Sequence, residues 1–229
     1  METHTPKDWN EFKETIADIR SKYNKSAWTA ASGKNYTQNT QILFRGQSNA
    51  QWSLKTTLER TLTKQISANR YCSILNHCVH EIESFSGHSW NLKDYPELMD
   101  EFKKCQDRFR GYFPTSIYPY LVYLRHHGCP SPLLDWSESP YIAAFFAFSD
   151  NTTEDVKERA VYCYIERPEG SKAHSSDQPM IFLHGPYTTT DKRHFSQKAW
   201  YTIATRWNEH IKQHIFVPHE EWMNQKRNF

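Results

Sequence analysis

The sequence has no long apolar run, no closely spaced cysteine pair and almost no excess of charge of one sign. A membrane-spanning helix needs about 18 or more apolar residues in succession, so we expect no membrane span. The opening residues, METHTPKDWNEF, also lack the apolar core of a signal peptide. These absences predict a cytoplasmic protein without membrane contact.

The five cysteines form an odd set without a CxxC pair, which favours reduced thiols over a disulfide framework. Two of them, Cys72 and Cys78, lie close in the chain to His77 and His80. Their spacing fits no usual zinc knuckle, in which ligands recur at short fixed intervals. We therefore expect no metal site.

The net charge of +2 neither requires nor excludes a nucleic-acid partner, whose electrostatic footprint would have to be local. Aromatic residues are abundant, at 15% of the chain, and predict a core carried by rings whose polar tips can line a cleft. A chain of 229 residues can bury such a core without disulfides or metals. We therefore expect a single domain over residues 1–229.

Apolar periodicity predicts helices mainly in the first two-thirds of the chain and strands mainly in the last third. Helices are expected near residues 5–19, 56–60, 62–86, 96–109, 114–126 and, with Ser139 as N-cap and Pro140 in the first turn, 139–148. Strands are expected at residues 41–45, 160–166, 179–183, 200–204 and 214–217. This distribution indicates an α+β fold around a small split sheet, mixed or antiparallel.

The same patterns suggest three parts along the domain. Residues 1–40 form a helical N-terminal extension in which the polar stretch 21–40 begins as helix and ends as loop. Residues 41–217 form the core that carries the motifs, and residues 218–229 form a tail.

The first motif places an arginine where a short strand ends, in the sequence LFRGQS from Leu43 to Ser48. The planar guanidinium of Arg45 suits a phosphate or carboxylate, and Gly46 lets a ligand approach the backbone. A structural alternative remains open, in which Arg45 pairs with a carboxylate such as Asp135 at the edge of the core.

The second motif is the stretch LRHHGCPSPLLDWSESPYIAAFFAF, which sets many polar groups among apolar ones. Asp135 lies between Leu134 and Trp136, and a buried polar group without a partner costs about 1–3 kcal/mol. We therefore expect Asp135 to be buried and paired with Arg45 or a backbone amide. His126 and His127 end a helix before Gly128, where they could transfer protons or merely cap the last carbonyls.

Together these motifs resemble the bacterial FRG-domain family. The likeness rests on FRG at Phe44, Arg45 and Gly46, followed by the pattern HHG-x-P-[ST]-x-LLDW-[ST]-x-SP-x-x-A-x-x-FA that begins at His126. It extends over about residues 41–217. The family's usual threonine and arginine after the HHG-x-P turn are Ser131 and Pro132 here.

The order of the motifs is in turn similar to that of ADP-ribosyltransferases, which implies their fold and NAD as substrate. By this resemblance Phe44, Arg45, Gly46 and Gln47 bind NAD together with His126, Ser137 and Ser139. The third element, a late catalytic Gln-x-Glu, is matched loosely by Gln197, with Ala199 where the glutamate would stand. Gln197, Asp135 and His127 are the catalytic residues that this reading implies.

A neutral glutamine can orient a ribose hydroxyl but supplies no full negative charge to an oxocarbenium-like state. Asp135 is the first candidate to supply that charge. Glu166, Glu220 and Glu221 are weaker candidates, because carboxylates at strand ends are usually solvated.

The resemblance implies transfer of ADP-ribose to a macromolecule with release of nicotinamide. It also implies a bacterial toxin or anti-phage effector with a protein antitoxin as partner. RNA is favoured over protein or DNA as acceptor, because basic and aromatic residues alternate near the end of the chain, at Lys192, Arg193, Lys198, Trp200, Tyr201, Arg206, Trp207 and Lys212.

Two other functions stay open. One is a nucleic-acid-binding module without catalysis, in which Arg45, His126 and His127 contact phosphates. The other is a hydrolase or nuclease that uses His127 and Asp135 as acid and base.

Overall fold

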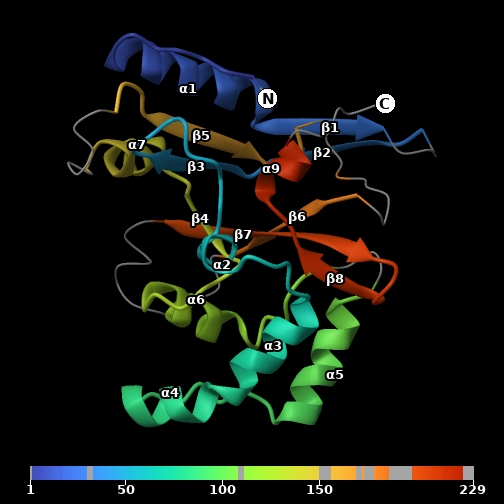
Figure 1. Ribbon diagram of the computed structural model, residues 1–229. Helices are drawn as coiled ribbons and strands as arrows, with labels where there is room; N and C mark the ends of the chain where they lie inside the picture. The colour runs from blue at the N-terminus through green and yellow to red at the C-terminus, as the bar shows by residue number, and fades with distance from the viewer. Residues whose placement is uncertain are drawn as a thin grey trace. The chain divides into compact units, whose positions relative to one another are not determined.

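The computed structural model describes residues 2–29, 33–107, 111–149, 156–168, 172, 178–185 and 198–223. Its internal contacts divide the chain into two compact units. The first unit comprises Met1–Trp52, Asp135–Ala173 and Ser196–Trp200, and the second comprises Ser53–Leu134, His174–Phe195 and Tyr201–Phe229. Helices and antiparallel strands occur in both units, which confirms the α+β class, whereas the single domain stays a prediction (Figure 1).

The first unit begins with helix α1, Trp9–Tyr23. Asp8 caps it, because its carboxylate accepts from the backbone amides of Asn10 and Glu11 at 2.7 and 3.0 Å. The predicted amphipathic helix is thus confirmed, but it starts and ends about four residues later than expected. Ile16 faces the core, whereas Trp9 at the first turn is 50% exposed.

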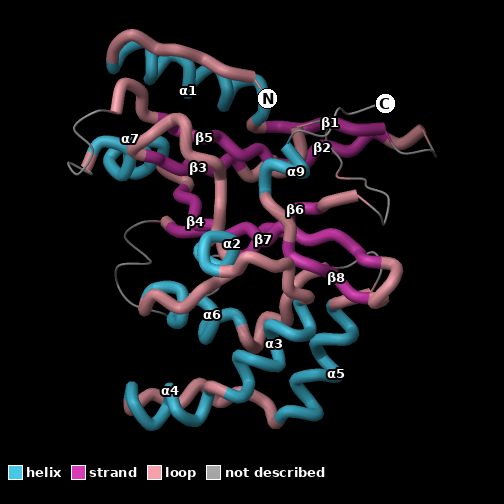
Figure 2. Tube along the Cα trace, in the orientation of Figure 1, coloured by secondary structure: helices cyan, strands magenta, loops and turns pink. Residues whose placement is uncertain are grey.

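A β-hairpin follows α1, where the sequence predicted helix and loop. Strands β1 (Lys25–Thr29) and β2 (Asn35–Asn39) pair antiparallel, as Figure 2 shows, so the expectation that residues 21–40 begin as helix and end as loop is wrong for these two strands. Gly33, in the left-handed conformation at φ +77°, lies in the connection between the two strands. A polar strand pair lacks the apolar alternation by which strands are recognised in sequence, and this explains the error.

The main sheet of the first unit has the strand order β5–β3–β4, from Ala160–Ile165, Ile42–Gln47 and Leu134–Ser137. All its pairs are antiparallel, with Phe44 opposite Cys163 on β5 and Ser137 on β4. Helix α7 (Pro140–Phe148) and α1 lie on one face, where Phe44, Ile16 and Ala143 form a buried apolar cluster. As predicted, Ser139 caps α7 and Pro140 is its first residue.

Strand β3 continues through Gly46, although the sequence suggested that it would end there. A Cβ on Gly46 would lie 1.8 Å from the carbonyl oxygen of Ala143 and 2.7 Å from the amide nitrogen of Ala147. The missing side chain therefore lets the backbone of α7 rest directly on β3. The structure thus gives this glycine a role in helix packing, and its role in access for a ligand stays a prediction.

The second unit holds most of the helices: α2 (Thr57–Thr61), α3 (Ala68–His77), α4 (Val79–Ser86), α5 (Tyr95–Cys105), α6 (Tyr118–His126) and α9 (His219–Met223). Thr56 and Glu59 form a reciprocal capping box at the start of α2. The long helix expected over residues 62–86 starts only at Ala68 and is divided at Cys78. The short helix α9 lies in a segment expected to be a tail.

Strands β6 (Met180–His184), β7 (Ala199–Asn208) and β8 (Gln213–Phe216) confirm the strands expected late in the chain, and they pair antiparallel in the order β6–β7–β8. The first two residues of β7 belong to the first unit. The core of the second unit is rich in rings: Phe113 stacks on Phe216 at 5.9 Å, and Tyr71 meets both edge-on. The aromatic core read from composition is thus confirmed.

No helix in the described part of the chain is long and apolar enough to cross a membrane.

We predict that Gly46→Ala destabilises the protein by about 3 kcal/mol or more, because the new methyl group meets backbone rather than a movable side chain. Gly87→Ala is the matched control. Gly87 has a left-handed φ of +66° but open space around its would-be Cβ, so only about 1 kcal/mol of backbone strain is expected. Urea unfolding measures both changes, and an equal or smaller effect of Gly46→Ala would contradict the packing role.

Candidate functional site

Arg45 on β3 reaches Asp135 on the neighbouring strand β4. Its Nη1 donates to the backbone carbonyl of Asp135 at 3.0 Å and lies 3.8 Å from the carboxylate Oδ2. The Arg45 side chain is 17% exposed and that of Asp135 is 40% exposed. The predicted pairing is confirmed, but the prediction that Asp135 is buried is wrong. Leu134 and Trp136 are buried. Because successive side chains of a strand point to opposite faces, the side chain of Asp135 lies on the face opposite theirs.

Phe44 and Gln47, on either side of Arg45 and Gly46, are buried. Phe44 is 1% exposed within the apolar cluster under α1 and α7, and the Arg20 guanidinium lies 5.7 Å from its ring centre. Gly46 lies under α7, and Gln47 is 8% exposed. Arg45 is therefore the polar side chain of this motif that stays partly open, and NAD contacts by the other three stay predictions.

Two serines shape the turn from β4 into α7. The Ser137 hydroxyl accepts from the Ser139 amide at 3.0 Å, and the Ser139 hydroxyl accepts from the Ile142 amide at 3.3 Å. Both serines, which were predicted to bind the ligand, thus accept hydrogen bonds from backbone amides at the start of the helix. The turn holds the residue between them, Glu138, in a defined place.

Glu138 is a polar centre that the sequence reading missed. Its Oε1 accepts from the indole nitrogen of Trp200 at 2.7 Å and from the Gln41 amide at 3.3 Å. Its backbone amide donates to the carbonyl of Lys198 at 3.2 Å. The other carboxylate oxygen, Oε2, has no hydrogen-bond partner among the described residues, and no ion pair holds the carboxylate there. Its position between two serines of the central motif is the signal that could have drawn attention to it.

The third element is described only in part. Gln197 lies outside the described residues, as do Lys192 and Arg193. Lys198 and Trp200, which follow Gln197 in the chain, both form hydrogen bonds with Glu138. The start of the third element is thereby attached to the central motif inside the first unit.

The two histidines of the central motif belong to the second unit. His126 Nε2 lies 3.1 Å from the hydroxyl of buried Tyr201 on β7. His127 Nδ1 lies 2.9 Å from the carbonyl of Tyr123, and its ring stacks on Tyr123 at 4.0 Å. His126 thus contacts the third-element segment, whereas the contacts of His127 shown here stay within its own helix.

The late glutamates considered as charge donors all have other partners. Glu166 is buried, with Lys172 2.9 Å from its Oε1 and the Tyr164 hydroxyl bonded to its Oε2. Burial lowers the pKa of Lys172, and the adjacent Glu166 opposes that shift. Glu220 accepts from the backbone amide of Leu54, and Glu221 pairs with Arg206. The expectation that these strand-end carboxylates are merely solvated is wrong for Glu166.

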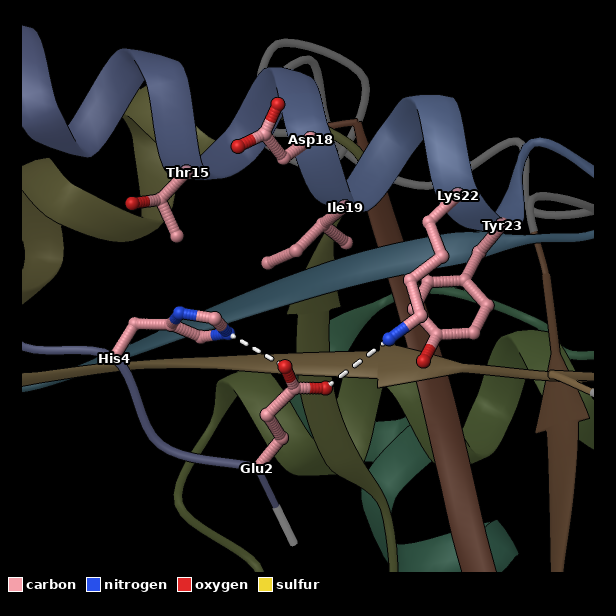
Figure 3. A pocket seen from close by; sticks show the side chains of 7 residues that line it. All are labelled: Glu2, His4, Thr15, Asp18, Ile19, Lys22 and Tyr23. Atoms are coloured by element: carbon pink, nitrogen blue, oxygen red, sulfur yellow. Dashed lines mark hydrogen bonds and ion pairs between the residues drawn. The ribbon is translucent and has the colours of Figure 1, made fainter.

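Figure 3 shows a pocket of about 110 Å³ between the N-terminal segment and α1. The Glu2 carboxylate lies there between the His4 ring and the Lys22 ammonium group, at 3.4 and 3.5 Å. These charged side chains are about half exposed and satisfy one another, and the lining contains none of the predicted site residues. Among the described residues no cluster of three or more His, Cys, Asp or Glu could hold a metal ion.

We predict that Asp135→Ala costs about 1 kcal/mol or less, because an exposed carboxylate 3.8 Å from its partner contributes little and the backbone carbonyl keeps its bond to Arg45. Leu134→Ala, at the fully buried neighbour, should cost about 2–5 kcal/mol. Chemical unfolding of both variants distinguishes them. A cost above about 3 kcal/mol for Asp135→Ala would show that the carboxylate acts as one half of a buried pair.

His184 gives the second unit a pH-dependent stability. Its ring stacks on Tyr118 at 5.7 Å, and its Nε2 is shielded from solvent without a hydrogen-bond partner among the described residues. Burial lowers the pKa of His184 from 6.5 to about 4. Between these values the unfolded chain binds the proton and the folded chain does not, so stability is lost as the pH falls through this window.

We predict that the parent loses about 3 kcal/mol more stability than His184→Phe between pH 7 and pH 4. Phenylalanine keeps the ring contact but cannot bind a proton. The exposed His80→Gln is the control and should follow the parent. Urea unfolding at several pH values tests this, and parallel pH profiles for the parent and His184→Phe would refute it.

Comparison with known proteins adds one finding. A protein-family model described as FRG domain matches residues 40–156, just over half of the chain. No curated protein and no solved structure is found to match. The matched region contains Arg45, the two histidines and the segment from Asp135 to α7, and it ends before the third element. The chain therefore belongs to the FRG-domain family.

Proposed function

We propose that this protein is an ADP-ribosyltransferase that uses NAD as substrate. One observation carries the proposal: three segments far apart in sequence meet in the first unit. Arg45 bonds to Asp135, and Glu138, three residues further on, bonds to Lys198 and Trp200 of the third element. The order of these segments is that of the motifs in the transferases that the sequence resembles.

Arg45 is the proposed anchor for the phosphates of NAD. Its bond to a backbone carbonyl fixes the guanidinium without neutralising it, and the Asp135 carboxylate at 3.8 Å compensates its charge only in part. A planar guanidinium is the side chain suited to bind a phosphate through two parallel hydrogen bonds.

Glu138 is the proposed source of the negative charge that Gln197 and Ala199 do not supply. Neutral donors, the Trp200 indole and the Gln41 amide, orient its carboxylate. No cation pairs with this carboxylate among the described residues, whereas the Asp135 carboxylate lies 3.8 Å from Arg45. The Arg20 guanidinium donates to the Glu138 backbone carbonyl, at 3.4 Å, and among the described residues no bond joins it to the Glu138 carboxylate. A fixed carboxylate of this kind stabilises a cation that develops in the transition state.

In the proposed reaction the bond between the nicotinamide nitrogen and C1′ of the ribose breaks, and its electron pair leaves with nicotinamide. C1′ becomes cationic and forms a bond to an oxygen or nitrogen of the acceptor, which then loses a proton. Glu138 stabilises the cationic sugar, and Arg45 holds the diphosphate.

The acceptor proposed is a macromolecule, with RNA favoured, and the setting proposed is a bacterial toxin or anti-phage effector held by a protein antitoxin. Among the basic residues that suggested RNA, Arg206 and Lys212 pair with Glu221 and Glu209. Lys198, exposed beside Glu138, is the described basic residue nearest in the chain to Gln197.

The proposal predicts that the protein releases nicotinamide from labelled NAD and transfers the label to material in a cell lysate. Digestion with RNase or with protease then identifies the acceptor class. Arg45→Ala and Arg45→Lys should each lose most activity, and the exposed Arg60→Ala should keep it. Glu138→Gln keeps the shape and the Trp200 bond, and should lower kcat about 100-fold or more with little loss of stability.

Glu14→Gln, an exposed change on α1, is the control for Glu138→Gln. Full activity of Arg45→Ala would contradict the proposed role of Arg45 in binding the phosphates of NAD. If the parent itself releases no nicotinamide above the enzyme-free background and binds RNA equally with or without NAD, the proposal fails in favour of a binding module.

A further inference from the structure

Five aromatic side chains form an exposed patch on the first unit. Tyr141, Phe145 and Phe148 follow one another along α7 and are 50%, 66% and 63% exposed. Trp9 of α1, 50% exposed, lies 5.7 Å from Tyr141, and Phe146, 42% exposed, lies 5.8 Å from Phe145. We call these five residues the α7 patch.

The spacing within α7 separates an inner face from the patch. Ala143, Ala144 and Ala147 are buried, and Ala143 lies against Gly46 of β3. Tyr141, Phe145 and Phe148 recur at intervals of four and three residues, which is one side of a helix. The alanines of α7 thus pack in the core of the unit, and its large rings are exposed and available to contact another surface.

Single exposed apolar residues are ordinary, but neighbouring rings on this scale mark an interaction site. Each of these side chains has about 150–250 Å² of surface, so five that are about half exposed offer about 500 Å². Two such patches face to face would bury about 1,000 Å² in total from the rings alone, which is about the lower limit for a biological interface.

The chemistry of α7 limits what can cover the patch. Its sequence, PYIAAFFAF, holds no charged residue. The Arg159 guanidinium lies 5.4 Å from the centre of the Phe148 ring and donates to the carbonyl of Ala147. A nucleic-acid strand would need a row of cations beside the rings. The patch therefore suits an apolar, aromatic surface, and a second copy of the chain carries one.

We propose that the α7 patch joins two copies of this protein into a symmetric dimer, with the two α7 helices antiparallel. In such an isologous contact the two ends of the patch exchange partners and its middle meets itself. Phe145, between Tyr141 and Phe148, then lies near the two-fold axis. Arg159 at the Phe148 end approaches Trp9 of the second copy, as a cation over an indole ring. This inference is independent of the proposed function.

Sedimentation velocity across protein concentrations tests the dimer. Phe145→Glu places two like charges at the axis and should raise the dimer dissociation constant at least tenfold, about 1.4 kcal/mol. Phe85→Glu is the matched control, since Phe85 is 95% exposed on α4 in the other unit. It should leave the dissociation constant unchanged, and circular dichroism checks that both variants are folded.

Phe145→Cys provides a second test that needs no loss of affinity. A cysteine near the axis should form an intermolecular disulfide on mild oxidation. The yield of covalent dimer should be well above that of two controls, the parent, which has an exposed Cys78, and Phe85→Cys. A parent that stays monomeric at high concentration overturns the proposal. A dimer that Phe145→Glu leaves intact, or a patch that binds RNA or lipid vesicles in place of a second copy, also overturns it.

Discussion

The contact between Gly46 on β3 and the backbone of α7 is the constraint on which the first unit depends. A side chain at Gly46 would meet the Ala143 carbonyl at 1.8 Å, so the helix can approach the strand only because none is present. This approach brings Ala143 into the apolar cluster with Phe44 and Ile16. The turn that carries Ser137, Glu138 and Ser139 leads directly into this helix.

The turn from Ser137 to Ser139 joins the packed helix to the polar groups of the candidate site. Its two serines bond to backbone amides, which leaves Glu138 to reach out to Gln41 and Trp200. These neutral donors orient the carboxylate without pairing it with a cation. Arg45 is held in a comparable way, by the carbonyl of Asp135 more closely than by the carboxylate. Both charged groups are thus placed by the backbone and by neutral partners, the arrangement that a preorganised electrostatic site requires.

The same helix has two faces with different tasks. Alanines form its buried face, where Ala143 and Ala147 lie against Gly46 of β3, and aromatic rings form its exposed face. Within the apolar run at residues 143–147 the three alanines are buried in the core, whereas Phe145 and Phe146 are exposed. Periodicity marks which residues share a face, but a helix that is apolar all round does not reveal which of its faces is covered.

The sequence alone determined those features that depend on near neighbours. These include the Ser139 cap and Pro140 at the start of α7, the helix near Thr56, most strand positions and the FRG motif. The pairing of Arg45 with Asp135, 90 residues apart, is one of the alternatives that the sequence left open. Only the tertiary structure decided the exposure of Asp135, the reason for Gly46, the β1–β2 hairpin and the contacts of Glu138 with residues about 60 and 97 positions away. Local rules follow from backbone bonds over a few residues. A long-range contact depends on which surfaces meet after folding, and no short stretch of sequence carries that information.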